Sequence, residues 1–252
     1  MYGTRLPYRV TEADRKQFRI ADPALTTKTK REVFDLVHAN KQDFSIALLI
    51  LVQAIDLLTG DSLLHVAVRA QSMNSVIHLM EGFDRTNNPR NPFDHWSRHA
   101  FIAHQNRDGD TVFHVAARSG NLKLMIMLYR FINNHWSALD PDMEDEESPE
   151  NDKFPKTVDE GYSSSRLMLL ITKNRAGRGA AAEARFVGNY EISGWLDAVA
   201  NRLDPEGSRR TGQGISDMVD IVMEGFCYDL MIERKQRETQ EKLLTSFSYL
   251  RV

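Results

Sequence analysis

Two segments of the chain show the same pattern of apolar and polar positions. One begins at Thr59 with TGDSLLHVAVRAQSMNSVIHLM, and the other begins at Asp108 with DGDTVFHVAARSGNLKLMIMLY. Each opens on a Gly-Asp turn with Ser62 or Thr111 at a helix N-cap position, and apolar residues at helical spacing follow. The pattern predicts two copies of a unit made of a short helix, a turn and a second apolar helix. Such a unit buries its apolar faces by stacking on its neighbours.

The shared motif resembles the ankyrin repeat, whose first helix opens with T-P-L-H-x-A. The residues that carry the resemblance are Ser62, Leu64, His65 and Ala67 in the first copy, and Thr111, Phe113, His114 and Ala116 in the second. The resemblance implies an all-α ankyrin-repeat solenoid. Long insertions would separate its repeats, and a helical extension would follow at the carboxy-terminal end.

In ankyrin repeats the hydroxyl and the imidazole of this motif hydrogen-bond each other and tie the turn to the helix. The resemblance therefore gives His65 and His114 a structural role, with Gly60 and Gly109 permitting the turns that precede the helices. The alternative role is a catalytic base or a metal ligand, which histidines supply in many proteins.

A third copy begins near Asn174 with NRAGRGAAAEARFVGNYEISGWLDAV. Gly177 falls on the turn position, but Gly179 and Ala182 replace the hydroxyl residue and the histidine. Losing both partners together leaves no buried polar group unpaired, so the copy remains physically sensible. The earlier segment VFDLVHANKQDFSIALLILV resembles an amino-terminal capping repeat, which is expected to be atypical because one of its faces meets water.

The copies are spaced more widely than the ankyrin period of about 33 residues. His65 and His114 are 49 residues apart, and His114 and Ala182 are 68 apart. We therefore expect insertions of about 16 and about 35 residues; the second is acidic, bounded by prolines and predicted to be a mobile loop. The expected organisation is an amino-terminal arm at 1–30, a degenerate cap at 31–58, repeats at 59–83, 106–133 and 174–203, inserts at 84–105 and 134–173, and an extension at 204–252.

The carboxy-terminal extension begins with a linker rich in glycine and charge, LDPEGSRRTGQG. One or two amphipathic helices are predicted after it, with Ile215, Met218, Val219 and Val222 spaced as a buried stripe. The polar stretch at 233–242 is interpreted either as a solvated helix or as a segment that binds another chain.

Three further features are candidates for partner contacts or regulation. Trp96 and Trp136 lie in identical His-Trp-Ser tripeptides, where they either contact a partner or pack beneath the inserts. A string containing Ser164 is similar to the D-S-G-x-x-S phosphodegron, with Glu160 in place of the first serine. The acidic run at 140–152 either docks on a basic partner surface or is a solvated loop; its candidate contact residues are Asp142, Glu144, Asp145, Glu146 and Glu147.

Composition, charge and the absence of known motifs argue against several classes of function. Hydrophobic residues make up 42% and charged residues 27%, and the net charge is −3, so no global basic field attracts nucleic acid or an anionic membrane. The longest apolar run, at 46–52, is too short to span a bilayer. The single cysteine, Cys227, favours the cytosol or the nucleus. The chain holds no catalytic motif and no cysteine–histidine cluster, so we expect no enzymatic activity, cofactor or metal.

The turn sequence is also similar to the opening repeats of the inhibitor-of-NF-κB (IκB) family, which read D-G-D-[ST]-x-L-H-L-A. This resemblance implies a regulatory protein that binds and sequesters a Rel-homology transcription factor. The leading hypothesis is therefore a protein-binding module. The alternatives are a scaffold subunit that self-associates through its carboxy-terminal helix, and a targeting subunit associated with an enzyme.

Overall fold

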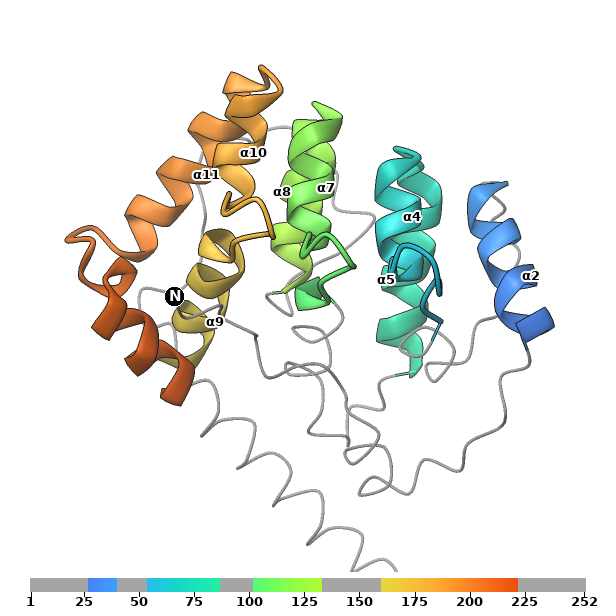
Figure 1. Cartoon of the computed structure of the whole chain (residues 1–252), viewed down its shortest axis with the longest axis horizontal. Coiled ribbons are helices and arrows are strands. Elements are labelled where there is room, and N and C mark those ends of the chain that lie inside the picture. Colours follow the sequence, from blue (N-terminus) through green and yellow to red (C-terminus); the bar gives the residue numbers. More distant parts are fainter. Residues whose placement is uncertain (1–26, 40–53, 87–101, 133–159, 222–252) are drawn as a thin grey trace, which may run out of the picture.

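A computed structural model of the chain describes residues 27–39, 54–86, 102–132 and 160–221, and in these residues the fold is all-α (Figure 1). Their one β-type contact is an isolated antiparallel bridge between Ile55 and Ser62. None of the described helices has both the length and the apolar character that crossing a bilayer requires. The named α-helices are α2 (Thr27–His38), α4 (Leu63–Arg69), α5 (Met73–Thr86), α7 (Val112–Ser119), α8 (Leu122–Phe131), α9 (Glu160–Ile171), α10 (Ala180–Phe186) and α11 (Tyr190–Leu203).

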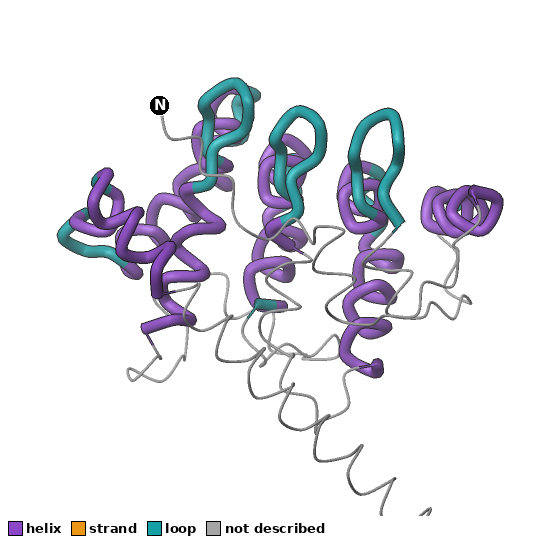
Figure 2. Tube along the Cα trace, turned by 60° about the horizontal axis from the view of Figure 1, so that its bottom comes forward, coloured by secondary structure: helices purple, strands orange, loops and turns teal. Residues whose placement is uncertain are grey.

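Three helix pairs stand side by side in a row (Figure 1). We call α4 and α5 the first pair, α7 and α8 the second, and α10 and α11 the third. The first helix of each pair contacts the first helix of the next, and α2 contacts α4 at one end of the row. A loop precedes each pair, and the three loops line up along one edge (Figure 2). The loops comprise residues 54–62, 104–111 and 172–179, which we call the first, second and third loops.

Local sequence signals fix where these helices begin and end. Ser62 and Thr111 lie at the N-caps of α4 and α7, as the sequence predicts. Gly120 ends α7 in the left-handed conformation at φ +75°, which glycine adopts without steric cost. Asn121 then caps α8 by accepting a hydrogen bond from the Leu124 N–H at 3.0 Å.

The core lies between the helix pairs, and its distribution shows where the row ends. All side chains from Leu63 to Val68 of α4 are buried, as are those from Val112 to Ala117 of α7. In α10 only Ala180, Glu183 and Ala184 are buried. The two earlier helices have neighbours on both sides, whereas α10 has a described neighbour in the row only on the side of α7.

The structure corrects the expectation for residues 160–171 and adds detail to the expected linker and to the helix that follows it. Residues 160–165 were expected to be the end of a mobile loop, and residues 166–171 were expected to lie in the same insert. Instead residues 160–171 form α9, whose side chains from Ser164 to Leu170 are buried. The apolar run at 167–171 supplies the buried face that stabilises this helix. The expected linker at 203–214 contains a 3-10 turn at Ser208–Arg210 and the start of a helix at 212–221. In that helix Met218 is buried.

Candidate functional site

The three loops are held together by their backbones. The Arg107 N–H donates to the Thr59 carbonyl at 2.9 Å, and the Arg175 N–H donates to the Asp108 carbonyl at 2.9 Å. Glycine makes this approach possible: a Cβ added at Gly60 would lie 2.9 Å from the backbone nitrogen of the next loop, and the same distance applies at Gly109. Each of these glycines also has a positive φ, a backbone conformation that glycine adopts without steric cost. The close approach of the loops and the positive φ therefore both favour glycine at these two positions.

Each of the first two loops is also tied to a histidine of the following helix. The Ser62 hydroxyl lies 2.8 Å from His65 Nδ1, and the Thr111 hydroxyl lies 2.8 Å from His114 Nδ1. The other ring nitrogen of His65 lies 3.0 Å from the Asp110 carbonyl, in the next loop. A carbonyl can only accept, so Nε2 carries the proton and Nδ1 accepts from the hydroxyl.

His114 repeats this arrangement one pair further along the row. Its Nε2 lies 3.0 Å from the carbonyl of Arg178, in the third loop. Burial lowers the pKa of His65 to about 4, with a further contribution from neighbouring His104, and burial likewise lowers the pKa of His114. Both imidazoles are therefore neutral at pH 7, with both nitrogens engaged. They connect loops and have no free lone pair for a base or a metal.

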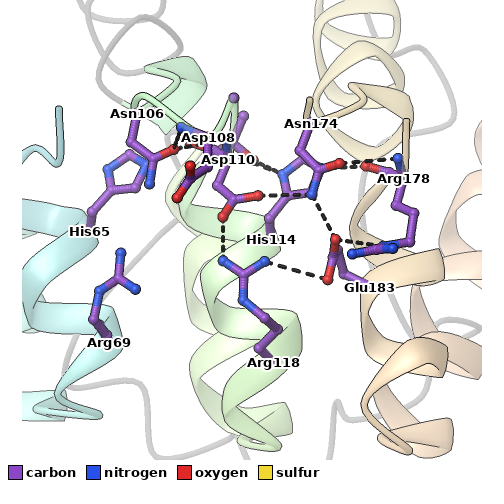
Figure 3. A network of polar contacts seen from close by, with 12 residues as sticks. His65, Arg69, Asn106, Asp108, Asp110, His114, Arg118, Asn174, Arg178 and Glu183 are labelled. Carbon is purple, nitrogen blue, oxygen red and sulfur yellow. Dashed lines mark hydrogen bonds and ion pairs between the residues drawn. The ribbon is translucent and has the colours of Figure 1, made fainter. Parts of the chain in front are cut away.

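Beneath the loops runs a chain of hydrogen-bonded residues that we call the polar ladder: Asp61, Asn106, Asp110, Asn174 and Glu183. Its link from Asn106 to Asp110 is made by the Asp110 backbone N–H, which donates to the Asn106 amide oxygen, and Figure 3 labels all of its members except Asp61. The Asn106 amide donates to Asp61 Oδ1 at 2.7 Å. The Asn174 amide donates one hydrogen to Asp110 Oδ1 at 2.9 Å and the other to Glu183 Oε1 at 2.6 Å. The amide oxygens of both asparagines accept backbone N–H groups of their own loops. Each asparagine therefore shapes its own loop and binds the preceding one.

Arginines balance the charge of the ladder. Arg69 bonds Asp61 at 2.7 Å, and Arg118 bonds Asp110 and lies 3.4 Å from Glu183. Burial opposes ionisation of Asp110, yet hydrogen bonds from Arg118 and Asn174 outweigh it and hold the pKa of Asp110 below its usual value.

Glu183 is a second buried carboxylate in the ladder and behaves in the same way. Burial opposes its ionisation, but hydrogen bonds from Arg178 and Asn174 lower its pKa. The ladder therefore carries ionised carboxylates at pH 7 that are paired rather than free to transfer protons.

The third pair departs from the other two at two further positions. Counted from the turn glycine, Arg178 stands where the earlier loops have Asp61 and Asp110. Phe186 stands where they have Arg69 and Arg118. The guanidinium of Arg178 bonds Glu183 at 2.8 Å and lies over the Phe186 ring. At the positions noted in the sequence, Gly179 is the N-cap of α10 and provides no side-chain bond.

The tips of the loops lie above this buried framework and remain accessible. Leu57 and Leu58 of the first loop are 71% and 82% exposed. Arg107 and Asp108 of the second loop and Arg175 of the third are also exposed. The arrangement presents apolar and charged groups on a backbone that the ladder and the histidines hold in place.

Sequence reasoning found the turn glycines, the caps and the histidines but missed the asparagines and Glu183. A usable signal exists: an Asn or Asp precedes each turn glycine by three or four residues, at Asp56, Asn106 and Asn174. The degron-like interpretation of Ser164 meets an obstacle, because this side chain is fully buried in α9. Trp96, Trp136 and the acidic residues at 142–147 lie outside the described residues, as does the polar stretch at 233–242.

In the part of the chain that the structure describes, no group of three or more histidine, cysteine, aspartate or glutamate side chains has the geometry of a metal site. The sequence matches no protein-family model and no curated protein. Among solved structures it is similar to a chain in the crystal structure of yeast ribosomal protein Rps3 in complex with its chaperone Yar1. The identity is 16%, the match covers 67% of this chain and 90% of that chain, and the TM-score is 0.44. A likeness at this TM-score supports neither a fold family nor a function for this chain.

Proposed function

We propose that this chain is an ankyrin-repeat protein that binds another protein through the tips of its loops. The observation that carries the proposal is the polar ladder, which locks the three loops together from below while their tips stay exposed. A surface that is ordered before binding loses little conformational entropy on association. Loops positioned by a rigid scaffold are also where binding residues concentrate.

The ankyrin assignment is supported by the geometry of the helix pairs. A hydroxyl at the N-cap pairs with a histidine three residues later in two of them, as the ankyrin resemblance implies. The first helices of the first two pairs are short and buried from Leu63 to Val68 and from Val112 to Ala117, and the loops project along one edge. Solenoids of this kind bind extended surfaces with the elements that successive repeats present side by side.

The loop tips also suggest the chemistry of the contact. Leu57 and Leu58 would supply apolar area at one end of the row, while Arg107, Asp108 and Arg175 supply charges of both signs. Because both leucines are largely exposed, burial in the fold does not account for them. Such residues are suited to the desolvated centre of an interface, with the charged tips at its rim.

The test is affinity purification from native cells with quantitative mass spectrometry, using the full chain as bait. The variant is Leu57→Ser/Leu58→Ser/Arg107→Ala, and the matched control is Glu191→Ala/Ala198→Ser, which changes two exposed residues of α11. We expect the variant to lose the partners that the wild type and the control both recover. Recovery of the same partners by all three proteins would refute a role for the loop tips.

A narrower proposal is that the partner is a Rel-homology dimer, as the resemblance of Asp108-Gly109-Asp110-Thr111 to IκB turns suggests. Its test adds the purified full chain to a Rel-homology dimer bound to its DNA site. Inhibitor-like activity would release the DNA, and the loop-tip variant would not. Failure of this test alone would leave the general binding function in place and remove only this partner.

A further inference from the structure

The tips of the three loops carry equivalent residues in a row. Counted from the Asp or Asn that opens each turn, Leu57, Arg107 and Arg175 stand at the same position, and Leu58 is an extra residue of the first loop. The backbone shows that the two arginines are equivalent, because each donates its N–H to a carbonyl of the preceding loop. All four side chains are exposed. The row therefore presents apolar area first and then two guanidinium groups.

The two arginines are positioned in the same way by the loop before them. The Cγ atom of Arg107 lies 3.1 Å from the place that a Cβ would take at Gly60, and the Cγ atom of Arg175 lies 3.3 Å from that place at Gly109. The aliphatic part of each side chain therefore rests on a turn glycine, while the charged end stays in water. A side chain that is partly ordered before binding loses less entropy when it binds.

The charges at the tips of the second and third loops are mostly positive. Arg107, Lys173 and Arg175 are exposed, and none of them forms an ion pair with another residue that the structure describes. The one exposed carboxylate of these two loops is Asp108. Arg178 does not add to this surface charge, because the ladder already pairs it. Although the whole chain has a net charge of −3, these two tips would attract an acidic segment.

The carboxylate at the start of the first loop is engaged by its own backbone. Asp56 accepts the N–H groups of Leu58 and Thr59 at 2.6 and 3.0 Å. The Thr59 N–H is the main cause of the lowered pKa of Asp56, and Arg107 contributes less to this shift than the hydrogen bonds of the loop do. Asp56 therefore holds the turn together and leaves the guanidinium of Arg107 available to a partner.

The spacing of the loops matches that of an extended chain. The first helices of neighbouring pairs are in contact, and packed helices lie about 8–10 Å apart, so the loops repeat at about this distance. A polyproline II segment rises about 3.1 Å per residue and has three residues per turn. Every third side chain of such a segment therefore points the same way, at intervals of about 9 Å. Three such side chains would meet the three loops in turn (Figure 2).

We propose that the loop tips bind an extended acidic segment of a partner protein, in which an apolar residue and two carboxylates follow one another at intervals of three residues. The apolar residue covers Leu57 and Leu58, and the carboxylates pair with Arg107 and Arg175. Guanidinium groups suit this role because they bind carboxylates through two parallel hydrogen bonds. The inference rests on the proposed binding function of the loop tips and specifies the chemistry of the partner.

Fluorescence anisotropy with the full chain tests this inference. The first probe is the labelled peptide Leu-Pro-Pro-Glu-Pro-Pro-Glu, because its prolines hold the polyproline II conformation. The second probe has lysine in place of both glutamates, and the third, Glu-Pro-Pro-Leu-Pro-Pro-Glu, has the leucine between them. We expect the first probe to bind at least about fivefold more tightly than either of the others, and its affinity to fall as NaCl is raised because the charges are exposed.

Charge reversal places the binding at the loop tips. Arg107→Glu/Arg175→Glu should reverse the preference, so that the lysine probe binds about fivefold more tightly than the first probe. Glutamate keeps the Cγ atom that rests on Gly60 or Gly109, so the packing of the loops is retained. Arg31→Glu is the matched control for the single change Arg107→Glu, because Arg31 is an exposed cation of α2. It should change the affinity for the first probe by less than about twofold.

Three results would overturn the inference. The first is equal affinity for the first and second probes, which would show that the tips do not select carboxylates. The second is an equal loss with Arg31→Glu and Arg107→Glu, which would assign the effect to net charge alone. The third is equal affinity for the first and third probes, which would remove the proposed order of contacts along the row.

A fourth result would reassign the occupant. If the first probe binds only after the carboxylates at 142–147 are changed to amides, the acidic segment of this chain occupies the tips and a partner does not. Failure of the inference is also distinguishable from failure of the general binding function. If Leu57→Ser/Leu58→Ser/Arg107→Ala loses its partners in the affinity purification while the first probe shows no preference, the tips bind proteins of another chemistry.

Discussion

The Cζ atom of Arg178 lies 4.1 Å from the centroid of the Phe186 ring. At the same two positions the second helix pair has Asp110 and Arg118, which form an ion pair. The charge at the loop position is therefore reversed in the third pair, where Arg178 is positive and its counterpart Asp110 is negative. The carboxylate that the ladder needs at this point comes instead from Glu183, which lies inside α10 and accepts from Arg178 at 2.8 Å.

Removing the arginine of this contact should cost more stability than removing the ring. Arg178→Ala leaves buried Glu183 with one cation fewer, and we expect a loss of about 1–2 kcal/mol, reduced because the guanidinium is partly exposed. Phe186→Ala removes an exposed ring and a cation–π contact worth about 0.5–1 kcal/mol. Urea unfolding at pH 7 measures both. Equal losses would show that the bond to Glu183 is not the main contribution of Arg178.

The amide at Asn174 is required because it faces two carboxylates. Its two hydrogens go to Asp110 and Glu183, so Asn174→Asp would place a third acceptor between them. We expect a loss of about 2–4 kcal/mol at pH 7, from two lost hydrogen bonds and repulsion between like charges. The loss should shrink as the pH falls, because the new carboxyl would have a raised pKa and regain a proton.

Asn106→Asp and Asp204→Asn provide comparisons for that measurement. Asn106 faces one carboxylate, Asp61, so the aspartate variant should lose less than Asn174→Asp. Asp204 accepts from Arg210 at 3.1 Å, so the reverse exchange should weaken an ion pair at pH 7 without introducing a new carboxyl group. Identical pH profiles for all three variants would contradict the role assigned to the ladder.

The identity of these residues explains what the sequence could and could not predict. The caps, the turn glycines and the hydroxyl–histidine pairs lie within about ten residues of one another, so a local motif reveals them. The ladder joins residues 45 and 64 positions apart. Those separations depend on inserts whose lengths follow no repeat period, and Asn106 and Asn174 look like ordinary turn residues in isolation.

The missed helix and the unexpected contact of the third pair have similar causes. The apolar run of α9 follows an acidic, proline-bounded stretch, and the composition of that stretch hid the short buried helix at its end. Arg178 and Phe186 look like random departures from the repeat unless they are compared as a pair.

Acid should destabilise the protein in two separate pH ranges. The pKa of His65 is lowered to about 4 by burial, whereas the unfolded chain binds a proton near pH 6.5. The unfolded state therefore holds more protons between these values, and stability falls as the pH decreases from about 6.5 to about 4. For this histidine the expected loss is on the order of 3 kcal/mol. Asp110 and Glu183 have lowered pKa values, so their contribution is lost at still lower pH.

Urea unfolding at pH 7.5, 6.5, 5.5 and 4.5 checks the first range. The double variant Ser62→Gly/His65→Ala reproduces the residues that the third pair has at these positions, and it should reduce the slope between pH 6.5 and 4.5 to the part that His114 contributes. At pH 7.5 the single variant His65→Ala should lose more stability than an additive share of the loss in the double variant. The reason is that the single change leaves the buried Ser62 hydroxyl without its histidine partner. An unchanged slope in both variants would mean that His65 is not the group responsible.

Gln71 has the strained backbone that the other two pairs avoid with glycine. Its φ is +50°, while Gly120 and Gly188, at the equivalent turns between the helices, have φ +75° and +86°. A left-handed conformation costs a residue with a Cβ about 1–2 kcal/mol, and the greater freedom of glycine in the unfolded chain offsets about 0.5–1 kcal/mol of this. Gln71→Gly should therefore raise the free energy of unfolding by up to about 1 kcal/mol. The gain is reduced by the loss of the exposed hydrogen bond that the Gln71 amide donates to the Ser119 carbonyl.

The reverse substitution is the control for this prediction. Gly120→Gln introduces the same strain in the second pair and places a Cβ 3.3 Å from the Asn189 amide oxygen, so it should lower the free energy of unfolding by about 1–2 kcal/mol. Gln71→Ala separates the two effects, because it removes the side-chain hydrogen bond and keeps the strain. If Gln71→Gly is no more stable than Gln71→Ala in urea unfolding, the positive φ at this turn is not the source of instability.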